Sequence, residues 1–141
     1  MRLYPDKIPH RLGEADTEKF EIVADSEFGK CIKSLGYFEI GQLVALIHTD
    51  IILKKAELHT AQISKDIHIY DPWFAGLISH SCEPNLIFDT NIPGFFAVKK
   101  ILPGDILNQD YELTEDDLYI KFDCKCGSPH CRGKIKGKIY K

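Results

Sequence analysis

Short segments in which apolar and polar residues alternate dominate the first half of the chain. Residues 20–24 are rich in apolar β-forming side chains, residues 30–34 alternate directly after a glycine, and residues 42–47 follow a glycine turn. Because successive side chains of a strand point to opposite faces, this pattern predicts strands over all three segments. A further short strand is predicted over residues 50–53.

The second half contains a predicted hairpin and a predicted loop. Apolar residues 86–88 and 94–98 flank the turn-forming sequence Asn91-Ile92-Pro93, which predicts two paired strands. The apolar segment 74–79 leads into residues 80–85, which are polar and contain a proline, so they cannot form the middle of a strand. We interpret residues 80–85 as a loop that carries a site.

Two segments have weaker patterns. Residues 1–19 contain prolines, a glycine and mixed charges without clear periodicity, and we interpret them as an N-terminal arm, with a first strand as the alternative. Residues 54–58 have the most helix-forming composition, but the stretch is short. Since the chain shows no repeat and no long linker, the pattern predicts one mostly β domain.

Composition agrees with a single folded unit, and the overall charge gives no information about partners. Of the 141 residues, 44% are apolar, which is enough for one sizeable core. A net charge of -3 gives no general attraction to nucleic acid or to anionic membranes. No apolar run approaches the roughly 20 residues of a membrane-spanning helix, and no secretory signal is visible at the N-terminus. We therefore expect an intracellular protein, cytoplasmic or nuclear, without a membrane segment.

Three of the five cysteines lie close together near the C-terminus, at Cys124, Cys126 and Cys131. Cysteines in a chain without a secretory signal favour metal binding or catalysis over a disulfide framework. Zinc takes four ligands in a tetrahedron, so three local thiolates need a fourth ligand from elsewhere in the chain. The spacing therefore predicts a structural zinc site with one distant ligand.

The candidates for that fourth ligand are Cys82, Cys31, His130 and His80. Cys82 lies in the polar loop, where a buried thiol has little apolar surface to contact. Cys31 lies in an alternating strand, where a small buried residue is ordinary. His130 lies within the tight turn of the cysteine cluster itself. We favour Cys82 and keep the others as alternatives.

Residues 122–133, with the sequence FDCKCGSPHCRG, resemble the post-SET motif of SET-domain protein lysine methyltransferases. In that family three tail cysteines share a zinc ion with a cysteine from a distant loop, and residues 79–85 resemble that loop. Residues 97–111 resemble the family segment that ends in the sequence GEELTFDY, and residues 26–31 resemble part of its first strands. The resemblance implies that Cys82 completes the zinc site.

The resemblance also implies a fold and a division of the chain. The fold would be the mostly β SET-domain fold, with small curved sheets, a pseudoknot-like threading of the C-terminal part and a zinc-bound tail. Residues 1–19 would be the N-terminal arm, residues 20–115 the SET domain, and residues 116–141 a post-SET zinc-binding segment with a basic tail.

The activity that the resemblance implies is transfer of a methyl group from S-adenosyl-L-methionine to a lysine side chain of a protein or peptide. Tyr111 would be the catalytic residue, because the family places a tyrosine hydroxyl near the reacting centre. Zinc (Zn2+) would have a structural role only. The residues expected to contact the cofactor are Phe28, Gly29, Lys30, Cys31, Ser79, His80, Tyr111 and Ile135.

Several departures from the family pattern support other interpretations. Ser79 replaces an asparagine, Cys31 replaces a glycine, and Asn108 and Gln109 replace a threonine and a phenylalanine. These changes would weaken cofactor binding, so the alternative is a catalytically impaired SET-fold module that binds peptides or serves as a scaffold. A third interpretation is a small zinc-ribbon protein that binds nucleic acid, but only Phe122 and the basic tail would support it.

Charge near the C-terminus bears on the partner. Residues 132–141 are basic and contain no acid, whereas residues 105–123 are rich in acids. Such runs usually form solvated surfaces. A functional acidic run would favour a lysine- or arginine-rich peptide, such as a histone tail, by charge complementarity. We expect a lysine-containing protein or peptide substrate and no direct nucleic-acid binding, while no oligomeric state follows from the sequence.

Overall fold

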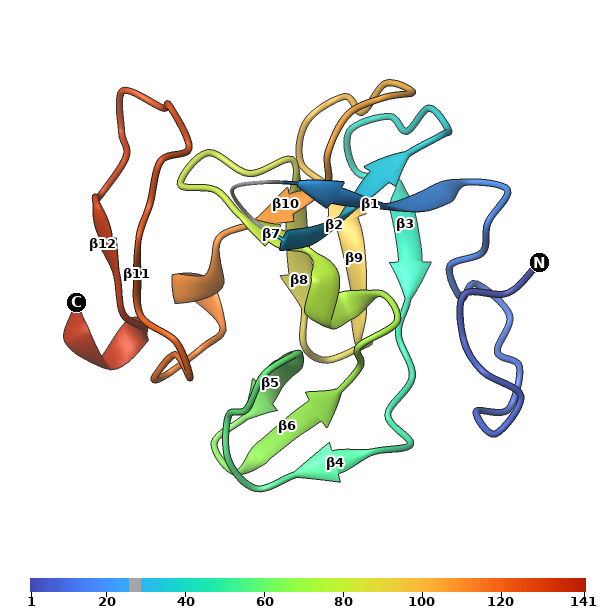
Figure 1. Ribbon diagram of the computed structural model, residues 1–141, viewed down its shortest axis with the longest axis horizontal. Helices are drawn as coiled ribbons and strands as arrows, with labels where there is room; N and C mark the ends of the chain where they lie inside the picture. The colour runs from blue at the N-terminus through green and yellow to red at the C-terminus, as the bar shows by residue number, and fades with distance from the viewer. Residues whose placement is uncertain (26–28) are drawn as a thin grey trace.

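The computed structural model describes residues 1–25 and 29–141, in which short strands dominate and the helical parts are single 3₁₀ turns (Figure 1). The strands are β1 (Phe20–Asp25), β2 (Gly29–Ser34), β3 (Leu43–Leu46), β4 (Ile52–Leu53), β5 (Thr60–Ser64), β6 (Ile67–Tyr70), β7 (Ser79–His80), β8 (Leu86–Asp89), β9 (Gly94–Ala97), β10 (Asn108–Gln109), β11 (Phe122–Asp123) and β12 (Lys134–Ile135). The 3₁₀ turns are η1 (Ala75–Leu77), η2 (Tyr111–Leu113) and η3 (Lys138–Tyr140). Within the described ranges, no helix is long and apolar enough to cross a membrane.

The strands pair into small sheets. β1 pairs with β2, β9 lies between β3 and β8, β6 lies between β4 and β5, and all these pairs are antiparallel. β11 and β12 are also antiparallel, whereas β7 and β10 run parallel. The strands predicted over residues 20–24, 30–34 and 42–47 are confirmed as β1, β2 and β3, and the predicted hairpin is confirmed as β8 and β9.

The structure differs most from the sequence-based prediction over residues 54–68. The helix-forming stretch 54–58 is not helical, and it ends in a turn in which the Thr60 hydroxyl donates to the Glu57 carbonyl oxygen at 2.8 Å. A stretch this short gains too few hydrogen bonds to offset the cost of helix nucleation. β5 and β6 follow this turn and were not predicted from the sequence.

The core is built around four fully buried phenylalanine side chains, Phe20, Phe38, Phe74 and Phe95. The ring centroid of Phe74 lies 5.1 Å from that of Phe20 and 6.1 Å from that of Phe95, both in edge-to-face arrangements. Phe20 also stacks on Phe38 at 5.9 Å. Aromatic pairs at these distances add to the stabilisation from burial, so this cluster joins β1, β9 and the segment before η1.

Residues 1–19, interpreted from the sequence as an arm, pack against this core. Tyr4, Ile8 and Ala15 are each at most 4% exposed. The Tyr4 hydroxyl donates a hydrogen bond of 2.6 Å to the buried carboxylate of Asp71. The N-terminal residues therefore share the hydrophobic core with the strands.

The segment that precedes Tyr111 runs between β2 and the loop after β7. The backbone N–H at position 107 donates to the β2 backbone at 2.9 Å. Asn108 and Asn85 each donate a backbone N–H to the other's side-chain oxygen, at 2.9 and 2.8 Å. The parallel pairing of β10 with β7 then places Tyr111 beside His80, although the two residues are 31 positions apart.

The C-terminal segment returns to the same region after a hairpin of β11 and β12, which lies at the opposite side of the molecule from the N-terminus (Figure 1). Gly137 permits this return, because its φ is +131° and a Cβ at this position would clash with the carbonyl group of Asp116. Directly after it, the N–H of Lys138 donates to the carbonyl oxygen of Glu115 at 2.8 Å. The tail thus packs against the residues that follow η2.

Candidate active site and cysteine cluster

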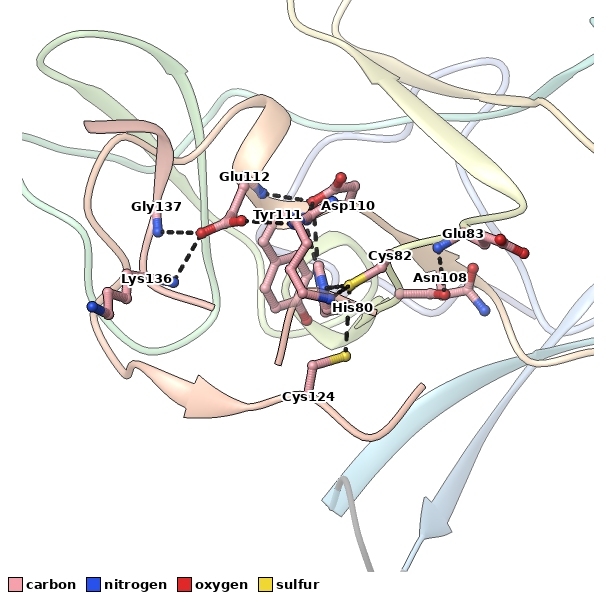
Figure 2. Close-up of polar contacts among 12 residues, drawn as sticks. His80, Cys82, Glu83, Asn108, Asp110, Tyr111, Glu112, Cys124, Lys136 and Gly137 are labelled. Atoms are coloured by element: carbon pink, nitrogen blue, oxygen red, sulfur yellow. Dashed lines mark hydrogen bonds and ion pairs between the residues drawn. The ribbon is translucent and has the colours of Figure 1, made fainter. Parts of the chain in front are cut away.

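Four cysteine sulfurs from two distant segments meet beside η2. The Sγ atoms of Cys82, Cys124, Cys126 and Cys131 all lie within 4.8 Å of one another. Those of Cys82 and Cys124 are 3.9 Å apart (Figure 2). Four thiolates placed tetrahedrally at about 2.3 Å from zinc would be separated by about 3.8 Å, so the cluster fits a structural zinc ion. Its members are the four cysteines predicted from the sequence.

The other candidates for the fourth ligand do not join this cluster. Cys31 is buried in β2 and is 1% exposed. The His130 side chain is 78% exposed, and its Nε2 lies 3.6 Å from the Glu83 carboxylate. Within the cluster, a hydrogen bond from the backbone N–H of Ser128 lowers the pKa of Cys126 to about 6. This favours the thiolate, the form that binds metal ions.

Two groups outside the cluster contact the Cys82 sulfur. The backbone N–H of Arg132 donates to it at 3.4 Å. Nε2 of His80 lies 3.5 Å away (Figure 2). The other ring nitrogen of His80, Nδ1, accepts the backbone N–H of Tyr111 at 3.1 Å. Burial lowers the pKa of His80 to about 4, so the ring is neutral near pH 7. Because Nδ1 accepts, the ring hydrogen is on Nε2 and is directed at the sulfur.

Arg132 fastens the tail to η2. Its guanidinium group donates to Asp110 at 2.6 Å and to Glu112 at 3.0 Å. The second carboxylate oxygen of Glu112 accepts the backbone N–H groups of Lys136 and Gly137, each at 3.0 Å (Figure 2). Asp110 and Glu112 are only 7% and 5% exposed. This part of the acidic run therefore holds the tail and is not a free charged surface.

Tyr111 is held by its ring and by its hydroxyl. The rings of His80 and Phe122 lie with centroids 5.2 and 6.1 Å from that of Tyr111. The hydroxyl donates to the backbone carbonyl oxygen of Ile78. Burial, together with the nearby charge of Glu115, raises the pKa of Tyr111 well above its ordinary value. The side chain therefore stays a neutral phenol whose hydrogen is engaged and whose oxygen lone pairs remain available as acceptors.

A cavity of about 750 Å³ opens beside Tyr111. This volume lies within the range of about 300–1,000 Å³ that small-molecule sites occupy. Its walls come from the start of β2 and from residues 56–61, 75–80 and 109–125, although not every residue of these ranges lines it. Cys124 belongs to the wall, so the cysteine cluster closes one side of the cavity.

The cavity brings together most of the residues expected to contact a cofactor, namely Gly29, Lys30, Ser79, His80 and Tyr111. Cys31 and Ile135 do not line it. Cys31 follows Lys30 in β2, where successive side chains point to opposite faces, and it is buried in the core. Ile135 is fully buried in the hairpin opposite Phe122. Phe28 lies outside the described residues.

Several polar residues of the cavity wall were not predicted as site residues, among them Glu115, Gln109 and His59. Glu115 is 8% exposed and accepts the backbone N–H of Gln62 at 2.7 Å, and burial raises its pKa to about 7. Gln109 is 6% exposed, and its Oε1 has no hydrogen-bond partner within the described part of the chain. His59 adopts a positive φ of 67°. The only sequence signal for Gln109 was its place directly before Asp110 and Tyr111, where the family has phenylalanine.

Similar curated proteins include two human histone-lysine methyltransferases. Histone-lysine N-methyltransferase 2B of Homo sapiens is 38% identical over 64 residues, which cover 41% of this chain and 2% of that protein. Histone-lysine N-methyltransferase EHMT1 of Homo sapiens is 33% identical over 110 residues, which cover 66% of this chain and 8% of that protein. Methyltransferase flvH of Aspergillus flavus is 32% identical over 110 residues, which cover 74% of this chain and 60% of that protein. The chain thus spans less than two thirds of the length of each relative.

Solved structures of SET-domain enzymes share the fold. KRYPTONITE in complex with mCHH DNA, H3(1-15) peptide and SAH superposes with a TM-score of 0.64 at 23% identity, covering 82% of this chain and 29% of that one. The methyltransferase domain of human SETMAR superposes with a TM-score of 0.59 at 18% identity, covering 81% of this chain and 56% of that one. No protein-family model matches the chain.

The fold and the cysteine cluster together define a SET-domain protein with a post-SET type of tail. Histone-lysine methyltransferases are among its relatives, so the chain is similar to the SET-domain protein lysine methyltransferase family, as the motifs of the C-terminal half predicted.

Proposed function

We propose that the protein is a protein-lysine N-methyltransferase that uses S-adenosyl-L-methionine. The observation that carries this proposal is the cavity, because one space of about 750 Å³ is lined jointly by Gly29, Ser79, His80 and Tyr111. These residues come from segments far apart in the sequence, and the resemblance assigned each of them to the cofactor or to the reacting centre. Their shared position around one cavity supports a site for the cofactor and the lysine side chain.

The relatives support the choice of cofactor and reaction. The KRYPTONITE structures contain SAH, the product that remains when S-adenosylmethionine has given up its methyl group. In the proposed reaction, S-adenosylmethionine supplies a sulfonium methyl group. The carbon–sulfur bond breaks as the carbon–nitrogen bond to lysine forms, and the lysine nitrogen gives up a proton. Such a displacement depends mainly on alignment of the reactants and on exclusion of water.

Tyr111 would orient the lysine amine. Its hydroxyl hydrogen is engaged by the Ile78 carbonyl group, so the phenol oxygen is held in a fixed position with its lone pairs available. A fixed acceptor can take an amine hydrogen or contact the electron-poor methyl group, and it loses no freedom when the reactants bind. Since burial keeps Tyr111 a neutral phenol, its proposed role is to position the amine and not to remove its proton.

The cavity wall around Tyr111 suits a lysine side chain. Ala61, Ile78 and Leu118 are buried apolar residues of the wall. An unperturbed lysine has a pKa of about 10.4 and must lose its proton to attack, and apolar surroundings disfavour the charged form. The unpaired Oε1 of Gln109 would accept an amine hydrogen of the lysine.

The proposed substrate is a lysine-containing protein or peptide, such as a histone tail. Glu57 and Asp123 are exposed acids of the cavity wall and favour basic residues beside the target lysine, although Lys30 and Lys125 line the same cavity. The named relatives that act on histones support the same class of substrate. Relatives that act on histones also favour a nuclear location.

A second candidate function is a SET-fold module that binds peptides without methyl transfer. Ser79 favours it, because serine lacks the carboxamide that the family uses beside the cofactor. Cys31 does not favour such a module, since its side chain is buried in the core and does not line the cavity. The substitutions at Ser79 and Gln109, which both line the wall, are therefore the main structural argument for impaired catalysis.

Calorimetric titration of zinc-loaded protein with S-adenosylmethionine tests the proposal. We expect binding at micromolar to millimolar cofactor and transfer of methyl groups to a histone H3 tail peptide, detected by mass spectrometry. The Ser79→Asn variant restores the family side chain and is expected to bind the cofactor more tightly. An absence of heat at millimolar cofactor, for wild type and Ser79→Asn alike, would contradict methyl transfer. Peptide binding in the same preparation would then support the module.

A further inference from the structure

We propose that His80 is a positioning residue that links the cysteine cluster to Tyr111. One edge of the imidazole ring contacts the Cys82 sulfur, and the other edge accepts the backbone N–H of Tyr111 (Figure 2). A metal ion held by the cysteines would therefore influence the position of Tyr111 through the His80 side chain.

The geometry leaves His80 little freedom. Its side chain is 2% exposed and packs against two aromatic rings, with centroids 5.2 Å from Tyr111 and 5.6 Å from Phe122. The nearest carboxylate oxygen, from Asp110, is 3.8 Å from Nδ1 and is itself engaged by Arg132 at 2.6 Å. Among the described residues, the ring thus has two polar neighbours within hydrogen-bonding distance, one on each side.

Metal binding would strengthen the contact on the cysteine side. A cysteine that binds zinc does so as a thiolate, and a hydrogen bond to a charged acceptor is about twice as strong as one to a neutral acceptor. The Nε2–H group then stays on the sulfur, which leaves Nδ1 without a hydrogen and able to accept from Tyr111. Groups that contact metal ligands from outside commonly fix their orientation in this way.

Arg132 makes a second connection in the same direction. Its backbone N–H donates to the Cys82 sulfur, and its guanidinium group donates to Asp110, the residue before Tyr111. Two connections from one sulfur to adjacent residues explain how a distant zinc site bears on the reacting centre. The two contacts of His80 can be removed one at a time. The amide of asparagine imitates the Nδ1 position, and the amide of glutamine imitates the Nε2 position.

The variants His80→Asn and His80→Gln separate the two contacts. Asparagine places an acceptor near the position of Nδ1 and cannot reach Cys82. Glutamine places an amide donor near the position of Nε2 and removes the acceptor for Tyr111. His130→Asn is the matched control, because His130 is exposed and lies beside the cluster without contacting Cys82.

Cobalt-substituted protein reports on the cysteine side. Thiolate-to-cobalt absorption should shift in His80→Asn and remain as in wild type in His80→Gln and in His130→Asn. The affinity for zinc, measured by competition with a chelator, should fall about tenfold to a hundredfold in His80→Asn alone. Neither measurement depends on methyl transfer, so failure of the proposed function would leave both interpretable.

The amide resonance of Tyr111 in a ¹⁵N–¹H spectrum of zinc-loaded protein reports on the tyrosine side. It should move in His80→Gln and stay close to wild type in His80→Asn. Exchange of zinc for the larger cadmium ion should shift this resonance in wild type and have less effect in His80→Asn. The kinetic readout rests on the proposed function: kcat should fall in His80→Gln with little change in KM for the peptide.

The proposal is overturned if the two variants behave alike in both spectra, because His80 would then act only by packing. It is also overturned if metal exchange leaves the Tyr111 amide resonance of wild type unchanged. If methyl transfer is absent while the two spectra separate the variants as described, the link stands and the proposed function fails.

Discussion

Arg132 donates to the carboxylate of Asp110 at 2.6 Å, which ties the residue after the last cysteine to the residue before Tyr111. The same guanidinium group donates to Glu112 at 3.0 Å, and both carboxylates are nearly buried. A planar guanidinium group suits two acceptors at once. The tail and the active-site segment therefore form one unit, which is stabilised at this point by charge as well as by the cysteine cluster.

Arg132→Ala should lower the free energy of unfolding by about 2–4 kcal/mol, because it leaves two buried carboxylates without their cation. Arg132→Lys should recover only part of this loss, since an ammonium group cannot span both carboxylates in the same geometry. Denaturant unfolding of the zinc-loaded protein measures both values. The control is Lys134→Ala, which removes an exposed ion pair with Asp123 at 3.4 Å and should cost less than about 1 kcal/mol. Equal losses for Arg132→Ala and Lys134→Ala would contradict the buried clamp.

Tyr111→Phe should reduce methyl transfer on the order of a hundredfold or more, because it removes a fixed polar group at the reacting centre. Zinc content and the affinity for S-adenosylmethionine should remain close to wild type. Stability should fall by about 1–3 kcal/mol, since the Ile78 carbonyl group loses its donor. Tyr37→Phe is the control, because Tyr37 is exposed and bonds Glu39. Retained activity in Tyr111→Phe would assign the role to another residue.

Cys82→Ser should lower the affinity for zinc at least about tenfold and reduce the melting temperature, because it removes one thiolate of the four. The matched control is Cys31→Ala, which removes the remaining cysteine of the chain and should leave the zinc content at one ion per chain. Metal analysis after dialysis against a chelator separates the two variants. Unchanged zinc in Cys82→Ser would show that another residue supplies the fourth ligand.

The strands that the sequence predicted and those that it missed differ in the kind of residue that they bury. The strands β1, β2 and β3 were predicted because apolar alternation along a strand is a local property of the chain. β5 and β6 were missed because Gln62 and His68 are buried polar residues, at 3% and 6% exposed, and hide the alternation. The burial of Gln62 depends on a distant partner, because its side chain bonds Asp116, 54 positions away.

In the candidate site, too, local features of the sequence were predictable and features that depend on distant contacts were not. The cysteine cluster was predictable because three of its members are close in sequence and the family resemblance supplied Cys82. The burial of Glu115 and Gln109 was not predictable, since each depends on a distant segment: Glu115 accepts the backbone N–H of Gln62, and Gln109 pairs with His80 of β7. Cys31 was placed at the cofactor from a motif, and only the register of β2 shows that its side chain is buried.

Glu115 should make stability depend on pH in an identifiable way. Burial raises its pKa to about 7, so the folded state binds this proton more tightly than the unfolded state does. The resulting stabilisation is complete below the unfolded pKa of about 4.3 and is lost as the pH rises through 7. The free energy of unfolding of wild type relative to Glu115→Gln should therefore fall by roughly 3 kcal/mol between pH 4 and pH 8. Glutamine keeps an acceptor for the Gln62 N–H, and parallel pH curves for the two proteins would contradict the raised pKa.

Gln109 should stabilise a bound lysine but destabilise the folded protein when no lysine is bound. An unpaired buried oxygen costs about 1–3 kcal/mol, so Gln109→Met, which keeps a similar volume, should raise the free energy of unfolding by about 1 kcal/mol. The same variant should lose selectivity between two peptides that differ only in lysine or norleucine at the target position. Wild type should favour the lysine peptide about tenfold, because norleucine lacks the amine hydrogen that Oε1 would accept. Calorimetry with both peptides measures this ratio, and Gln42→Met, at a remote exposed position, should leave it unchanged. A ratio that is the same in wild type and Gln109→Met would show that the unpaired oxygen does not face the amine.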